Sequence, residues 1–183
     1  MGLRLKIVME ELILIKPSVK YGAQIMEYRQ EFLDAGDSMD GCGPLRRCDN
    51  TTEYLNFCSD CENLATVPEN FVQATQFICV RKSDNKLVGM IQVRHYFNEY
   101  LEKYSGHIGY SVRPSERRKG CAKEMLKMAL PFCKEIGLNK VLISCTDGNI
   151  GSEKTILANG GVYESTVHEP NKNKNLKRFW ITL

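Results

Sequence analysis

The sequence predicts a mixed α/β fold in one domain, with a central sheet of about seven strands flanked by about four helices. Short apolar runs bounded by turn residues alternate with amphipathic segments, in the order strand, two helices, three strands, helix, strand, helix, two strands. The composition, 43% apolar and 26% charged, is ordinary for a folded domain with a hydrophobic core. We expect residues 9–183 to form this domain and residues 1–8 to be a loose N-terminal extension.

The first half of the chain supplies one strand, two helices and an irregular segment. The apolar run at residues 11–16 predicts a strand. Ser18 is placed to cap the following helix, which continues to Gly36. Residues 37–50 are rich in Gly, Pro, Asp and Cys and predict a loop. Thr51 or Thr52 then caps a second helix through Leu64.

The second half supplies the remaining strands and two helices. A turn at residues 83–86 joins two of these strands into a hairpin. A polar and aromatic segment, residues 97–105, connects the hairpin to the next strand. The predicted strands are residues 76–81, 87–96, 106–112, 141–145, 162–167 and 176–182, and the two helices follow Gly120 and Asn149. The helix after Gly120 has an apolar stripe at helical spacing, formed by Ala122, Met125, Leu126, Ala129, Leu130 and Cys133.

The junction between the strand at residues 106–112 and the next helix has no ordinary helix cap. Gly120 stands where Ser, Thr, Asp or Asn is usual, and Arg117, Arg118 and Lys119 precede it. Cations beside the positive end of a helix dipole are unfavourable, and the first amides have no evident acceptor. A bound anion would remove both problems, because glycine lets a phosphate approach the backbone closely. The junction therefore predicts a phosphate site; a solvated basic loop is the alternative.

The spacing Arg117-x-x-Gly120-x-Ala122 resembles the pyrophosphate-binding motif of the GCN5-related N-acetyltransferase (GNAT) superfamily. A second segment, from Asn149 to Gly161, resembles the next motif of that family, with Ile156 and Leu157 on the apolar face of its helix. The chain is similar to bacterial acetyltransferases of unassigned substrate. The resemblance implies the GNAT fold, acetyl-CoA as co-substrate, and an acyltransferase that passes the acetyl group to a primary amine by direct attack in a ternary complex.

The resemblance also implies which residues contact the cofactor. Backbone amides from Arg118 to Lys123 would hold the diphosphate, and the backbone around Val112 would pair with the pantetheine arm. Asn149 and Ser152 would reach the pantetheine, unless they only cap their helix. Lys154 would either reach a phosphate or remain solvated. The predicted cofactor-binding residues are Val112, Arg113, Arg117, Arg118, Lys119, Gly120, Cys121, Ala122, Lys123, Asn149 and Ser152.

The catalytic groups are less clearly marked. Related enzymes often use a tyrosine to protonate the leaving thiolate, and Ile156 occupies that position here. Another group or solvent would then protonate it, since a thiol pKa of ~8.5 makes departure as an anion tolerable. His107 and Tyr110, on the strand before the turn, are the candidate catalytic residues, with a structural role for His107 as the alternative. Tyr163 is a weaker candidate.

Two other functions fit the same residues. Ile156 at the acid position favours a non-catalytic CoA- or acetyl-CoA-binding sensor or regulatory module. A binder of another phosphorylated ligand or of nucleic acid is disfavoured by the net charge of only +3. The acceptor, a small-molecule or peptide amine, would be selected by residues 37–70 and 97–105. Acidic residues in these segments could attract a cationic amine: Asp37, Asp40, Asp49, Glu53, Asp60, Glu62, Glu99 and Glu102.

We expect a cytoplasmic protein, monomeric or homodimeric, that binds neither nucleic acid nor membrane. No apolar stretch approaches the ~20 residues of a membrane-spanning helix. Four cysteines cluster in sequence and could hold zinc: Cys42, Cys48, Cys58 and Cys61. Because Cys58 and Cys61 fall in a predicted helix, and the other spacing matches no common zinc module, we expect free thiols and no metal.

Overall fold

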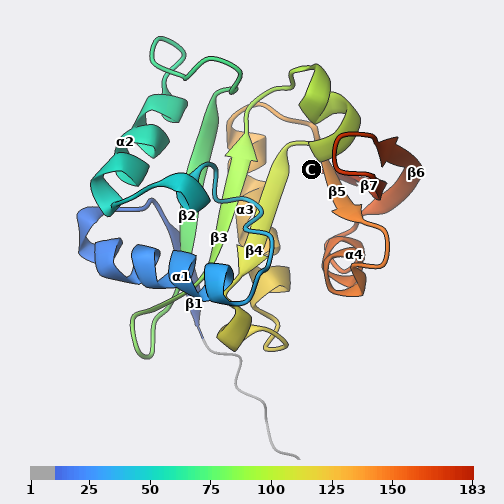
Figure 1. Cartoon of the computed structure of the whole chain (residues 1–183). Coiled ribbons are helices and arrows are strands. Elements are labelled where there is room, and N and C mark those ends of the chain that lie inside the picture. The colour runs from blue at the N-terminus through green and yellow to red at the C-terminus, as the bar shows by residue number, and fades with distance from the viewer. Residues whose placement is uncertain (1–10) are drawn as a thin grey trace, which may run out of the picture.

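The computed structural model describes residues 11–183, which form two sheets with helices packed around them (Figure 1). The predicted boundary between the extension at residues 1–8 and the domain lies outside the described residues. One sheet has the order β1-β2-β3-β4, and the other the order β5-β7-β6. The strands are β1 (Leu12–Ile15), β2 (Ala74–Arg81), β3 (Lys86–Arg94), β4 (Ile108–Val112), β5 (Lys140–Thr146), β6 (Val162–Glu169) and β7 (Lys174–Thr182). The predicted strand number is confirmed, although the strands divide between two sheets.

Four α-helices were expected, and the described residues contain α1 (Gly22–Asp34), α2 (Thr51–Glu62), α3 (Cys121–Glu135) and α4 (Ile150–Leu157). Helices α1 and α2 cover one face of the four-stranded sheet and α3 covers the other (Figure 1). The mixed α/β fold and the order of its main elements are therefore confirmed. The segment 97–105, expected to be a simple connection, contains a short π-helix at Leu101–Ser105.

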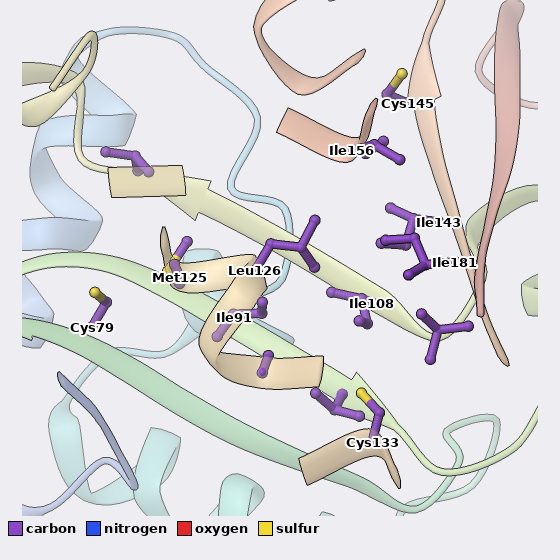
Figure 2. Close-up of a cluster of buried hydrophobic side chains, with 14 of the residues drawn as sticks. Cys79, Ile91, Ile108, Met125, Leu126, Cys133, Ile143, Cys145, Ile156 and Ile181 are labelled. Carbon is purple, nitrogen blue, oxygen red and sulfur yellow. The ribbon is translucent and has the colours of Figure 1, made fainter. Parts of the chain in front are cut away.

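The apolar stripe predicted for α3 forms the centre of the larger core cluster (Figure 2). Met125 and Leu126 are fully buried, in one cluster with Ile91 of β3 and Ile108 of β4. The same cluster continues through Ile143 of β5, Ile156 of α4 and Ile181 of β7. One continuous core therefore joins the two sheets and fixes their relative position.

The two sheets meet at one point, just before β4. The amide of His107 donates to the carbonyl of Leu142 over 2.8 Å, and Gly106 forms an isolated bridge with Ile143. Beyond this point β4 pairs only with β3, and β5 pairs only with β7. The edge of β4 that faces the second sheet is thus left without a partner strand.

Three details of the helices differ from the prediction. A 3-10 turn at Val19–Tyr21 separates Ser18 from α1, so the Ser18 side chain caps no helix. Asn50, rather than a threonine, caps α2 by accepting from the amide of Glu53 over 3.0 Å. Leu157, expected beside Ile156 on the apolar face of α4, is 48% exposed, because this short helix buries only one side.

The predicted helical position of Cys58 and Cys61 is confirmed, since both lie on α2. All eight cysteines are buried free thiols. Burial raises the pKa of Cys42 and of Cys58 to about 12, so both stay neutral and pack as small apolar groups. Within residues 11–183, no three side chains of the His, Cys, Asp and Glu types are placed to hold a metal ion. Nor does any helix in this range have the length and apolar character needed to cross a bilayer.

Candidate active site

A cleft of about 920 Å³ lies where β4 and β5 separate. All of β4 lines one wall, and Ser144, Cys145 and Thr146 of β5 line the other. The first turns of α3 and α4 close one end, and the loop from Asp37 to Gly41 borders the opening. The cleft therefore brings together the two segments that the sequence singled out, the turn before α3 and the start of α4. Its size falls within the range of small-molecule sites.

The free edge of β4 presents backbone hydrogen-bonding groups to this cleft. The amide of Arg94 donates to the carbonyl of His107, and the amide of Arg113 donates to the carbonyl of Val88. Backbone groups alternate in direction along an antiparallel strand, so odd-numbered residues of β4 face β3. The N–H and C=O groups of Ile108, Tyr110 and Val112 therefore face the cleft. An extended ligand could pair with them as an added strand.

Helix α3 starts without a side-chain cap, as the sequence predicted. Gly120 adopts the left-handed conformation, with φ +80°, and no side chain caps the helix. The first intrahelical bond that follows the turn runs from the amide of Glu124 to the carbonyl of Gly120 over 3.2 Å. The amides of Cys121, Ala122 and Lys123 precede it and have no acceptor one helical turn earlier. Four residues of this turn, Gly120 to Lys123, line the cleft.

The cations around the turn divide into two groups. Arg118, Lys123 and Lys154 line the cleft, and none has an ion pair with another described residue. Arg117 also lines the cleft, but its guanidinium bonds to Asp37 (2.7 Å) and to the carbonyl of Val112 (3.1 Å). Arg117 thus ties the turn to β4 and to the loop after α1, while the first three remain available to an anion.

Arg113 and Lys119, both predicted to contact the cofactor, do not line the cleft. The Arg113 side chain is buried and pairs with Glu31 of α1 at 2.8 Å. Lys119 donates to the buried carboxylate of Glu116 over 2.8 Å, which also accepts from Arg81 and Lys86. Through these ion pairs, both cations hold the turn in place.

Tyr110 and Ser152 were predicted separately and lie in contact. The Tyr110 hydroxyl is 2.8 Å from the Ser152 Oγ, and both residues line the cleft. Burial raises the pKa of Tyr110 well above its ordinary value, so the phenol stays protonated and cannot act as a base near neutral pH. Asn149 caps α4 by accepting from the Ser152 amide over 3.1 Å, and it also lines the cleft.

His107 does not line the cleft, so this geometry does not support the predicted role as a base. The ring is buried, its Nδ1 accepts from the amide of Leu142 over 3.0 Å, and it packs against Phe97. Burial, followed by the charge of Arg94, lowers the pKa of His107 to about 4. Tyr163 is 52% exposed on β6 and also lies outside the cleft. Ile156, at the position of the usual acid, is fully buried in the core.

His107 is expected to make the protein less stable as the pH falls from about 6.5 to about 4. In this window the unfolded chain binds a proton on the imidazole and the native state does not, so acid favours unfolding. Urea unfolding of the native protein and of His107→Asn, whose amide oxygen can still accept from Leu142, should show a shallower slope for the variant. Equal slopes for His107→Asn and the native protein would contradict this assignment.

Several residues of the cleft carry no recognisable signal in the sequence. Arg94, Tyr100 and Lys172 line it from the end of β3, the position just before the π-helix and the turn between β6 and β7. They lie far apart in the chain, and each belongs to a segment that local patterns describe only as polar. One informative pattern was missed: Glu116 is a carboxylate inside a run of cations. Such a pattern indicates ion pairs within the run.

Comparisons with known proteins agree with this geometry. The model of the acetyltransferase (GNAT) family matches residues 46–158. The chain is 21% identical to a GNAT-family acetyltransferase from Bacillus anthracis, with 94% of this chain and 95% of that chain covered and a TM-score of 0.64. A comparison with curated proteins gives no match.

Two further solved structures share the fold at lower identity. The microcin C7 self-immunity acetyltransferase MccE, solved with acetyl-CoA and AMP, is 17% identical, with 94% and 93% of the two chains covered and a TM-score of 0.68. The ribosomal-protein-S5-alanine acetyltransferase from Vibrio fischeri is 15% identical, with the same coverage and a TM-score of 0.70.

Proposed function

The chain belongs to the acetyltransferase (GNAT) family, and we propose that its cleft transfers the acetyl group of acetyl-CoA to a primary amine by direct attack in a ternary complex. Acetyl transfer from acetyl-CoA is the reaction of the family, in which proteins and small molecules serve as amine acceptors. The observation that carries the proposal for this cleft is the joint presence of an uncapped helix start and an open strand edge on one wall.

The fit to acetyl-CoA follows from the donors on that wall. The amides of residues 121–123, together with Arg118, Lys123 and Lys154, offer positive charge and N–H groups to the diphosphate. The backbone of Ile108, Tyr110 and Val112 offers donors and acceptors to the two amides of the pantetheine arm. Because the turn follows the end of β4, the arm would run back along the strand, and the thioester would lie near Ile108.

The chemistry needs few protein groups. The amine nitrogen attacks the thioester carbonyl, and an N–H of the β4 edge holds the oxyanion that forms. The C–S bond then breaks, the thiolate leaves, and the new amide loses the proton of the former amine. Tyr110 stays protonated because it is buried, and its hydroxyl lies 2.8 Å from the Ser152 Oγ, so water rather than Tyr110 supplies the proton to the thiolate. Arg113 and Lys119 contribute indirectly, by holding the turn in shape. His107 contributes indirectly, by joining the two sheets.

Release of free thiol from acetyl-CoA over a panel of amines tests this proposal, with the acetylated product identified by mass. We expect thiol release that depends on the amine, together with calorimetric binding of acetyl-CoA and CoA. Binding without thiol release for any amine would favour the alternative, a non-catalytic sensor of CoA or acetyl-CoA. Failure to bind either form of the cofactor would overturn both readings.

The dependence of kcat/KM on pH should follow the acceptor alone. No histidine lies among the described residues of the cleft wall, and burial keeps Tyr110 protonated. The rate should therefore rise with pH until the amine itself is deprotonated, and it should not fall again below about pH 10. A bell-shaped profile, with a falling limb between about pH 7 and 9, would indicate a protein acid and would contradict this mechanism.

A cytoplasmic location and a monomeric or homodimeric state remain predictions from the sequence. Transfer of the acetyl group to a small-molecule or peptide amine is compatible with both. Size-exclusion chromatography with light scattering would measure the oligomeric state directly.

A further inference from the structure

A second cavity, of about 370 Å³, adjoins the cleft beside the start of β4. The two share six lining residues and therefore lie against each other: Asp40, Gly41, Arg94, Tyr100, Ser105 and Lys172. Gly41 packs directly on the backbone of Gly109 in β4. If the pantetheine arm runs from Gly120 toward Ile108, its thioester points at this cavity. The cavity is therefore the place for the acceptor amine.

The acidic residues of the sequence predicted a negatively charged acceptor site, but the lining of this second cavity has net positive charge. Three cations, Arg47, Arg94 and Lys172, line it, and Asp40 is the one acidic residue among its described lining. Asp37 lines the cleft but pairs with Arg117 at 2.7 Å. The six other acidic residues named in the sequence line neither cavity. A purely cationic acceptor would therefore meet a wall of net positive charge.

Arg94 is the central cation of this wall. Its side chain is partly buried, and its Nη1 donates to the carbonyl of Gly106 over 3.1 Å. No carboxylate of residues 11–183 lies within ion-pair distance of it, whereas the buried Arg81 pairs with Glu116 at 2.7 Å and the buried Arg113 with Glu31 at 2.8 Å. Burial lowers the pKa of Arg94 to about 10, which still leaves it charged near neutral pH. Asp40 acts on Arg94 only from beyond ion-pair distance, so this poorly solvated cation remains costly, and an anionic ligand would reduce that cost.

We propose that the acceptor is a small amine that also carries an acidic group, either a carboxylate or a phosphate, and that Arg94 binds this group. The proposal rests on the proposed function and names the class of its substrate. The planar guanidinium suits bidentate contact with either oxyanion. Lys172, with its Nζ 5.5 Å from the centre of the Tyr100 ring, stands at the rim and adds a second cation. Asp40, in the same lining, would attract the amine end, and the volume fits a small molecule.

Matched pairs of acceptors test the proposal through kcat/KM for thiol release, expressed per concentration of free amine, because the two members of a pair differ in amine pKa. Amino acids are compared with their amides, and 2-aminoethyl phosphate with ethanolamine, so that the carboxylate and phosphate arms are separate. In at least one arm the acidic member should be preferred by about 10- to 100-fold, mostly through KM, which is the range for a hydrogen bond to a charged group.

Variants of the native enzyme assign this preference to Arg94. Arg94→Gln should abolish it while leaving the KM for acetyl-CoA unchanged, and Arg94→Lys should restore part of it. Lys172→Gln, at an exposed turn, should reduce it several-fold. Lys103→Gln is the matched control, because this exposed lysine of the π-helix lines neither cavity and should leave the ratio unchanged.

The outcomes are distinct. Equal or better turnover of the neutral members in both arms overturns the proposal and leaves the proposed function intact. An acid preference that survives in Arg94→Gln overturns the role of Arg94. If that variant does not fold, the native preference and its reduction in Lys172→Gln decide the matter. Absence of transfer to every amine, with acetyl-CoA bound, overturns this proposal together with the proposed function.

Discussion

Replacing Gly120 by alanine is expected to weaken the binding of acetyl-CoA by about 10-fold, because the left-handed turn that presents the amides to the diphosphate then costs about 1 to 2 kcal/mol more. Gly120 has φ +80° and ψ 0°, a conformation that costs other residues about 1 kcal/mol or more. An added Cβ meets no protein atom within 4 Å, so the chain does not resist it sterically. The strain instead favours a turn of different shape, in which the amides of residues 121–123 no longer converge on one anion.

Isothermal titration calorimetry with acetyl-CoA measures this loss, and Gly137→Ala is its matched control. Gly137 follows the C-terminal end of α3 with φ +90°, its added Cβ also meets nothing within 4 Å, and it lies outside the cleft. Both variants should lose about 1 kcal/mol of stability, since both force alanine into the left-handed region. Only Gly120→Ala should lose affinity. Native affinity in Gly120→Ala would show that the turn does not hold the diphosphate.

Replacing Glu116 by glutamine is expected to lower the free energy of unfolding by about 3 kcal/mol, the lower end of the cost of breaking a buried ion pair. The carboxylate is 3% exposed and accepts from Arg81 (2.7 Å), Lys86 (2.6 Å) and Lys119 (2.8 Å). Lys86 and Lys119 are partly exposed and can turn to water after the substitution, which keeps the loss near this lower end. The buried Arg81 would keep Asp84 as its partner.

Urea unfolding midpoints test this prediction, with Glu124→Gln as the control. Glu124 makes only a surface pair with Lys127 at 3.8 Å, so its loss should cost less than about 1 kcal/mol. Burial alone would raise the pKa of Glu116, but hydrogen bonds from Lys119, Lys86 and Arg81 outweigh it and lower that pKa to about 2. The stability that Glu116 contributes is therefore complete above its ordinary pKa of 4.5 and is lost as the pH falls toward 2. A difference between native and Glu116→Gln that stays constant down to about pH 2 would contradict this account.

Local signals explain what the sequence could predict. The stripe of α3, the uncapped Gly120 and the Asn149 cap of α4 each depend on a few neighbouring residues and on the geometry of one helix end. The hairpin of β2 and β3 was recognised for the same reason. The strand count and the order of the helices were therefore predictable.

The remaining features depend on contacts between distant segments. Arg113 and Lys119 have sequence neighbours typical of a phosphate site. Their side chains nevertheless form ion pairs with Glu31 and Glu116. His107 lies just before β4 rather than on it, and its Nδ1 accepts from the amide of Leu142, 35 residues away. The second cavity combines residues from the loop before α2, the end of β3, the π-helix and the turn after β6. No periodicity links these segments, so neither the charge of the cavity nor the position of Arg94 could be predicted.

Amide hydrogen exchange by NMR tests the central claim most directly, which is that the start of α3 binds the diphosphate of acetyl-CoA. The amides of Cys121, Ala122 and Lys123 have no intrahelical acceptor and should exchange quickly in the free protein. Saturating CoA should protect them strongly, whereas pantetheine, which lacks the diphosphate, should protect only the edge of β4. Equal exchange at these three amides with and without CoA, in a protein that binds CoA, would contradict the account.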